Sequence, residues 1–135
     1  MKRAPDPKEL LPLTPVVLHI LLALADGRRE QEDAAGRHGY AVAQEVEEMT
    51  DGQIRMGPGT LYGSIQRMLT SGLIEEVARG KTTRSVAATS DDGERRRYYR
   101  LSALGRRVLQ LELERLARVV VVARAKHLLT GPEPA

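Results

Sequence analysis

The chain has 135 residues, with 21 Lys and Arg against 18 Asp and Glu, four Tyr, and no Phe, Trp or Cys. This length fits one domain, and the absence of cysteine excludes disulfides, thiolate metal sites and cysteine catalysis. Acidic residues gather in the first half and arginines in the second, a separation that favours a surface attracting polyanions.

The N-terminal part combines an arm with a buried helix. Residues 1–12 hold three prolines among charges and predict a flexible, extended arm. Thr14 and Pro15 predict an N-cap and the first turn of a helix over Pro15–Ala25. This helix is apolar almost all round and is expected at the centre of the fold. No stretch has signal-peptide or membrane-spanning length, so we expect a cytoplasmic protein without a membrane partner.

A second helix is predicted over Ala41–Met49, after a long polar loop at Arg28–Arg37. The side of this helix that is expected to face solvent is acidic. Its buried side is expected to consist of Tyr40, Val42, Ala43, Val46 and Met49. A short strand over Ile54–Met56 would follow.

The next helix, Pro58–Ser71, begins at a Gly-Pro-Gly cluster, because proline is tolerated only in a first turn. Leu61, Ile65 and Met68 form one apolar stripe. The opposite face is expected to carry small or polar groups with one cation: Thr60, Gly63, Ser64 and Arg67. Such a face suits insertion into a DNA groove, and it equally fits an ordinary surface helix.

Two strands are predicted over Leu73–Val77 and Arg97–Leu101, with a hairpin tip between them that is rich in Thr, Ser, Ala and Gly. The order of elements is that of a winged helix-turn-helix, a mainly α fold with a small β wing. The expected divisions are a flexible arm over 1–12, a winged helix-turn-helix domain over 13–101, a dimerisation helix over 102–129 and a tail over 130–135.

The final helix, capped by Ser102 and running to about Leu129, carries two apolar stripes where a helix docked on one body needs only one. We expect the first stripe, Leu101, Leu104, Val108 and Leu111, to pack on its own domain. The second would pack on a partner in a homodimer: Leu109, Leu113, Leu116, Val120 and Ala123. A two-fold dimer also pairs two reading helices with two DNA half-sites. Pairs Glu112–Arg115 and Glu114–Arg118 would support the solvated side.

The sequence gives no sign of catalysis. The three histidines, His19, His38 and His127, lie on separate elements, without acids spaced for a zinc site or a catalytic triad. No phosphate-cradling glycine loop is present. We therefore expect no enzyme, no metal site and no cofactor, and we interpret His19 as a hydrogen-bonded core or interface residue.

Three segments in combination, HGYAVAQEVEEMT, GPGTLYGSIQRMLTSGLIEE and RRRYYRLSALGRRVL, resemble the PadR family of bacterial transcriptional regulators. The resemblance extends over about Leu13 to Ala125. It implies a winged-helix homodimer of the short-tailed branch that binds double-stranded DNA. It further implies repression of its own or neighbouring promoters and release by an effector.

The resemblance also implies roles for particular residues. Pro58–Ser71 would be the recognition helix, and Tyr62 would reach a phosphate through its hydroxyl, whereas Tyr40 and Tyr99 would be structural. The DNA-facing residues of this helix would be Thr60, Tyr62, Gly63, Ser64 and Arg67. Arg67 would contact a guanine edge or, as its late position favours, a phosphate.

The wing candidates for DNA contact are Lys81, Arg84 and Arg95, on a tip longer than the family commonly has. The chemistry of the effector is open, because family ligands are often flat aromatics and the final helix has no aromatic residue. A pocket there would be aliphatic, lined by Leu113, Leu116 and Val120.

An alternative of another class is a winged-helix protein-interaction module without DNA binding. The acidic second helix favours this alternative, since it would repel DNA if it faced the backbone. Salt-dependent DNA binding would distinguish the two functions.

Overall fold

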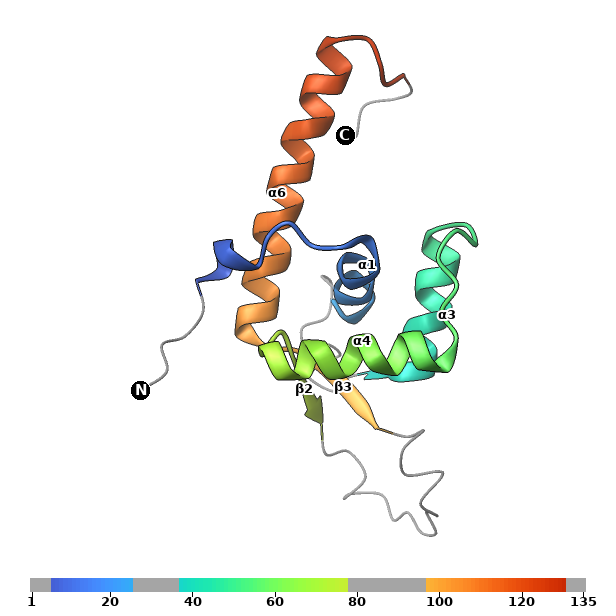
Figure 1. The fold of residues 1–135 in the computed structure, drawn as a ribbon. Coiled ribbons are helices and arrows are strands. Elements are labelled where there is room, and N and C mark those ends of the chain that lie inside the picture. Colours follow the sequence, from blue (N-terminus) through green and yellow to red (C-terminus); the bar gives the residue numbers. More distant parts are fainter. Residues whose placement is uncertain (1–5, 26–36, 78–96, 131–135) are drawn as a thin grey trace, which may run out of the picture.

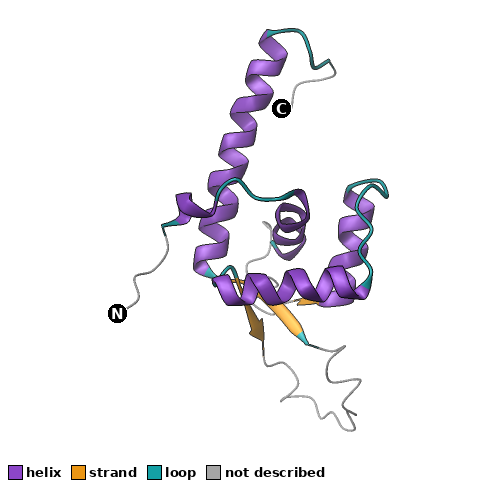
Figure 2. Ribbon diagram, in the orientation of Figure 1, coloured by secondary structure: helices purple, strands orange, loops and turns teal. Residues whose placement is uncertain are grey.

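The computed structural model describes residues 6–25, 37–77 and 97–130. These ranges form a mainly helical protein with a three-stranded antiparallel sheet, which confirms the predicted winged-helix fold (Figures 1 and 2). The elements are η1 (Pro7–Leu10), α1 (Pro15–Leu24), β1 (Arg37–His38), α3 (Gly39–Met49), α4 (Pro58–Ser71), β2 (Ile74–Val77), β3 (Tyr98–Leu101) and α6 (Ala103–Ala125).

Local capping signals account for the helix boundaries. The Thr14 side chain accepts a hydrogen bond from the Val17 amide, as predicted for the start of α1. Pro58 occupies the first turn of α4, and Gly72 ends that helix in the left-handed conformation with φ 84°, which glycine adopts without steric cost. Ser102 caps α6 by accepting from the Gly105 amide.

The sheet differs from the prediction in one strand. Ile54–Met56 forms no strand, and the third strand is instead β1, giving the order β1-β3-β2. Arg37 and His38 pair with Tyr99 and Tyr98, so they occupy the edge of β3 that is not paired with β2. The Ile54 amide instead donates to the Thr50 hydroxyl at the end of α3, which holds this segment as a connection.

Two terminal elements also differ from expectation. Within the segment predicted as an extended arm, Pro7–Leu10 is a 3-10 helix because Asp6 accepts from the Lys8 amide and caps it. The final helix ends at Ala125, not Leu129, and His127 follows with φ 60°. The loop predicted over Arg28–Arg37 is wrong at Arg37, which begins β1, and its other residues lie outside the described ranges. The predicted hairpin tip at 80–94, with Lys81 and Arg84, and the neighbouring Arg95 also lie outside them.

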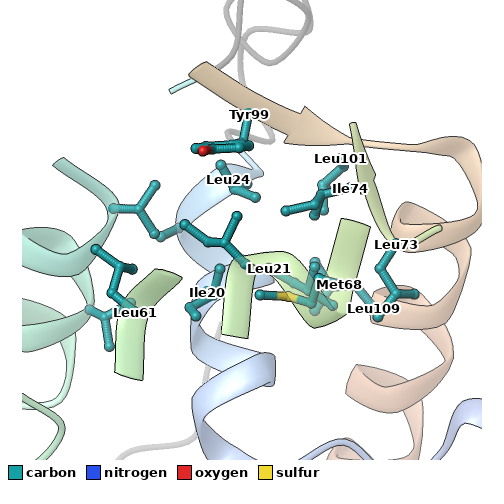
Figure 3. Packing of buried hydrophobic residues seen from close by; sticks show 14 of the residues in the cluster. Ile20, Leu21, Leu24, Leu61, Met68, Leu73, Ile74, Tyr99, Leu101 and Leu109 are labelled. Carbon is teal, nitrogen blue, oxygen red and sulfur yellow. The ribbon is translucent and has the colours of Figure 1, made fainter. Parts of the chain in front are cut away.

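The core is built around α1, whose Ile20 and Leu21 are fully buried. Figure 3 shows these two residues between Leu61 and Met68 of α4 and, on the sheet side, Tyr99 and Leu101. The predicted apolar stripe of α4 therefore faces inward. Tyr99 is 3% exposed, as expected for a structural residue.

Helix α3 buries Val42 and Val46, but the prediction that Tyr40 and Met49 are buried is wrong, since they are 62% and 40% exposed. Tyr40 lies two residues before Val42, which places it on the opposite side of a helix with 3.6 residues per turn. Met49 is the last residue of α3. The helix thus presents an aromatic side chain to solvent at its N-terminal end.

The two halves of helix α6 have different surroundings. Its first half packs on the winged helix through Gly105, Val108, Leu109 and Glu112, which are all buried. Its second half extends away from the rest of the described chain (Figure 1). Leu109, expected on a partner-facing stripe, is 4% exposed and belongs to the core of the chain's own fold.

Candidate nucleic-acid interface

The helix-turn-helix unit consists of α3, the connection 50–57 and α4. Thr50 caps the end of α3, and its hydroxyl donates to the Val46 carbonyl while accepting from the Ile54 amide. Asp51 and Gly52 both have positive φ, which reverses the chain within two residues. The connection leads into α4, which lies across the view below α1, with β2 and β3 extending beneath it (Figure 1).

The N-terminus of α4 is open. Its N-cap is Gly57, which has no capping side chain, and an added Cβ at Gly57 or Gly59 would meet no atom within 4 Å. Thr60 in the same turn is exposed. The first amides of a helix lack partners within the helix and carry partial positive charge, so this end is suited to an approaching phosphate.

Tyr62 connects α4 to the N-terminal end of α3. A Cβ added to Gly39 would lie 3.0 Å from the Tyr62 hydroxyl oxygen and 3.2 Å from its ring. Gly39 therefore makes room for the Tyr62 ring, and the hydroxyl lies beside the first turn of α3. Tyr40 is the next residue and is largely exposed. The Tyr62 hydroxyl thus lies beside the N-terminal end of α3, next to the exposed Tyr40.

Arg67 is exposed and folds back along α4. Its Nη2 donates to the Ser64 hydroxyl over 3.3 Å, and its Nη1 would lie 3.8 Å from a Cβ on Gly63. Ser64 itself is 2% exposed. The expectation that Ser64 is presented on the open face is therefore not met, because Ser64 falls between Leu61 and Met68 on the inward side. Its hydroxyl orients the Arg67 guanidinium.

The structure thus brings Thr60, Gly63 and Arg67 onto accessible positions of one helix, with Tyr62 half-buried beside them. Sequence reasoning missed two further residues on this unit, Tyr40 and Arg55. Arg55 is an exposed cation just before α4, and its Nε lies 3.3 Å from the Glu47 carboxylate. The position of Arg55, a single arginine just before the glycine cluster, was the sequence signal that could have indicated its place beside α4.

The sequence suggests an acidic first half and an arginine-rich second half, but ion pairs offset part of the positive charge of the second half. Across the wing strands, Arg100 pairs with Glu75 at 3.0 Å and Arg97 with Glu76 at 3.4 Å. These arginines are therefore partly neutralised and contribute less to a polyanion-attracting surface than their number implies.

The acids of α3 are also partly paired. Arg37 forms an ion pair with Glu45, and Arg55 pairs with Glu47. Glu48 and Asp51 are exposed and line an open hollow at the end of α3 with Gln44. The repulsion of DNA expected from this helix is thus reduced at two of its acids.

The projecting half of α6 has an exposed apolar surface. Four consecutive valines, Val119–Val122, are between 38% and 65% exposed, and Leu113 is 38% exposed. Leu116 and Ala123, from the predicted partner-facing stripe, are half-buried.

The prediction that Glu112 lies on the solvated side of α6 is wrong. It was expected on the solvated side with Arg115, but its side chain is 1% exposed. The pair with Arg115 exists, at 2.7 Å from Nε to Oε1, and the Leu13 amide also donates to Glu112 over 3.1 Å. These bonds lower the pKa of Glu112 despite its burial: the Arg115 hydrogen bond contributes most and the Leu13 amide adds to it. Its spacing from Val108 and Leu109, four and three residues, was a signal that it faces inward.

The described ranges show neither a metal site nor a membrane-spanning helix. No group of three or more His, Cys, Asp or Glu side chains there is placed to hold a metal ion. No helix in those ranges combines the length and apolarity needed to cross a membrane. The half-buried His19 donates a hydrogen bond from Nδ1 to the Pro15 carbonyl oxygen over 2.7 Å, so the hydrogen-bonding part of its interpretation is confirmed.

Comparison with known proteins adds two findings. The sequence model of the "Transcriptional regulator PadR-like family" matches residues 31–111, which is more than half of the chain. The chain is also similar to an uncharacterized protein, "protein X", of Lysinibacillus sphaericus. The two are 29% identical over 83 residues, which cover 62% of this chain and 68% of that protein.

Proposed function

Because this chain belongs to the PadR-like family of transcriptional regulators, we propose that it is a sequence-specific DNA-binding protein that reads DNA with α4. The observation that carries the proposal is the accessible side of α4. The 14-residue helix has an N-terminus without a capping side chain, an unhindered glycine at its N-cap and another in its first turn, and the exposed Arg67 farther along. A helix of this kind fits the major groove of B-DNA.

The proposed contacts are of two kinds: contacts to phosphates, which position the protein on DNA, and contacts in the groove, which read the base sequence. The open first turn of α4 and the hydroxyls of Tyr40 and Tyr62 would hold phosphates, and Thr60 and Arg67 would reach the groove. Gly63 would allow close approach of the helix. Ser64 would act through Arg67, whose guanidinium it orients. Lys81, Arg84 and Arg95 remain proposed wing contacts.

We extend the proposal to a homodimer formed through the projecting half of α6. The exposed leucine and valines there are the support for this step, since contiguous apolar surface on a protein marks an interaction site. Leu113, Leu116, Val120 and Ala123 would form the seam, and a two-fold axis would present two α4 helices to two half-sites.

Repression of its own or neighbouring promoters, relieved by an effector, completes the proposal and rests on membership of the family. The protein would act in the cytoplasm, where bacterial promoters are accessible. The chemistry of the effector is left open.

The test is a fluorescence-anisotropy titration of the full chain with labelled DNA from its own upstream region, beside a scrambled duplex of equal composition, at two salt concentrations. The proposal expects tight binding to the upstream DNA that weakens with salt, because phosphate contacts release counterions. Equal, weak binding to both duplexes would contradict self-regulation. No salt-dependent DNA binding at all would favour the protein-interaction module.

A further inference from the structure

The buried carboxylate of Glu112 joins two segments, α6 and the N-terminal part of the chain. On its own helix it pairs with Arg115 through two hydrogen bonds, of 2.7 Å and 3.0 Å. From the N-terminal segment, the Leu13 amide donates to it. A buried charge is costly unless it is paired and hydrogen-bonded, and both conditions hold here. Glu112 therefore ties α6 to the chain just before α1.

The tied segment also lies beside the proposed reading helix. Leu10, Pro12 and Leu13 line one side of an open, mostly apolar groove of about 270 Å³, and Arg67, Met68 and Ser71 of α4 line the other. Leu13 directly precedes Thr14, the N-cap of α1. Glu112 thus holds the segment that lies between α6 and α4.

A second connection holds the base of α6. The Ser102 hydroxyl donates to the Gly72 carbonyl at the end of α4, and the Ser102 amide donates to the Leu73 carbonyl. Ser102 and Glu112 are ten residues apart, a separation of about 15 Å along a helix. With one connection alone, α6 could rotate about that point, whereas two connections fix the direction of the α6 axis relative to the winged helix.

From this arrangement we propose that Glu112 is a positioning residue that fixes the tilt of α6 on the winged helix and thereby sets the separation of the two α4 helices in the dimer. This inference rests on the proposed homodimer. The half of α6 beyond Glu112 would form the dimer seam, and it extends about 20 Å to Ala125. A small change of tilt at Glu112 is therefore enlarged at the reading helices, which must match half-sites about 34 Å apart.

The test measures that separation directly. The chain has no cysteine, so Gln66→Cys, at an exposed position of α4, accepts one spin label per protomer. Pulsed electron–electron double resonance then gives the distance between the two spin labels, one on each α4 helix of a dimer. Gln110→Cys, exposed on α6, reports the α6-to-α6 distance in a parallel sample.

Each label is combined with Glu112→Leu, which removes the hydrogen bonds to Leu13 and Arg115 but leaves the Ser102 connection, and with Glu112→Gln, which keeps an oxygen for the Leu13 amide but loses the charge pair. The matched control is Glu114→Gln, an exposed glutamate on the same helix. Far-UV circular dichroism and a cooperative thermal transition establish that each variant is folded. If Glu112→Leu does not fold, Glu112→Gln and Arg115→Ala replace it.

The inference expects Glu112→Leu to shift or broaden the Gln66 distance distribution by several ångströms and to leave the Gln110 distribution unchanged. Glu112→Gln should give a smaller change, and Glu114→Gln none. A folded Glu112→Leu dimer with the wild-type Gln66 distribution would overturn this inference alone, because a residue that merely stabilises the fold does not move the helices. Absence of dipolar coupling in the wild type would overturn the homodimer as well.

Discussion

The hydroxyl of Ser102 donates to the carbonyl oxygen of Gly72 over 2.5 Å, and so the cap of α6 is bonded to the cap of α4. The Ser102 hydroxyl oxygen also accepts from the Gly105 amide. One side chain therefore begins the proposed dimerisation helix and fastens it to the end of the proposed reading helix.

Replacement of Ser102 by alanine should lower the free energy of unfolding by about 1–2 kcal/mol, the usual effect of losing an N-cap. Urea denaturation followed by circular dichroism measures it. Ser71→Ala is the control, since the Ser71 hydroxyl donates to Met68 within its own helix and its loss should have a smaller effect. Equal effects of the two substitutions would show that the bond to Gly72 contributes nothing.

Gly105→Ala should be much more destabilising. A Cβ at this position would lie 1.9 Å from the Leu73 carbonyl oxygen, so α6 and the start of the wing would have to separate. We expect a loss of at least about 3 kcal/mol, at or above the usual range for overpacking. Gly63→Ala is the comparison, because its Cβ would meet only the Arg67 side chain at 3.8 Å. A Gly105→Ala protein as stable as the Gly63→Ala protein would contradict the close approach.

Arg67→Ala should weaken specific DNA binding at least several-fold. If Arg67 contacts a phosphate, the slope of log affinity against log salt should also fall by about one. Anisotropy titrations over a salt series measure both quantities. Arg118→Ala, which removes an exposed arginine from the projecting half of α6, should leave them unchanged. Unaltered affinity of Arg67→Ala at moderate salt would remove this residue from the interface.

Val120→Glu should convert a dimer to monomers, because it places a charge in the middle of the proposed seam. Sedimentation velocity over a range of concentrations gives the assembly state. Gln110→Glu adds the same charge at an exposed position in the first half of α6 and should not alter assembly. A dimeric Val120→Glu protein would place the seam elsewhere.

The stability contributed by Glu112 should depend on pH. Its pKa is lowered from 4.5 in the folded protein, first by the hydrogen bond from Arg115. The unfolded chain therefore binds the proton more readily, so the stabilisation is complete above the unfolded pKa and is lost as pH falls through the folded pKa. The difference in unfolding free energy between wild type and Glu112→Gln should accordingly be largest near neutral pH and shrink in acid. A constant difference between wild type and Glu112→Gln across this pH range would contradict the lowered pKa of Glu112.

Features determined by neighbouring residues could be predicted from the sequence. Thr14, Pro58 and Ser102 begin helices because their side chains or rings satisfy local backbone requirements, and each helix begins where these residues predict. The order of elements follows from these boundaries, and with it the fold class.

Features determined by the direction of a side chain or by distant pairing were predicted less well. Ser64 and Glu112 lie at inward-facing spacings, but their polarity favoured an assignment to the outer face. Only the packed structure reveals their burial and their hydrogen-bond partners. Strand β1 depends on pairing between Arg37–His38 and β3, some 60 residues later, which no local pattern reports. The DNA contacts and the dimer seam stay predictions.

The four valines of α6 have a consequence for how the protein would assemble. Valine is a poor helix former because its branched side chain loses rotamer freedom, and Val119–Val122 lie on the half of the helix that extends away from the domain (Figure 1). Short helical segments without packing are marginal in water. Helix formation in this half and association of two chains would then be one coupled event, so that dilution should both dissociate the protein and reduce its helicity.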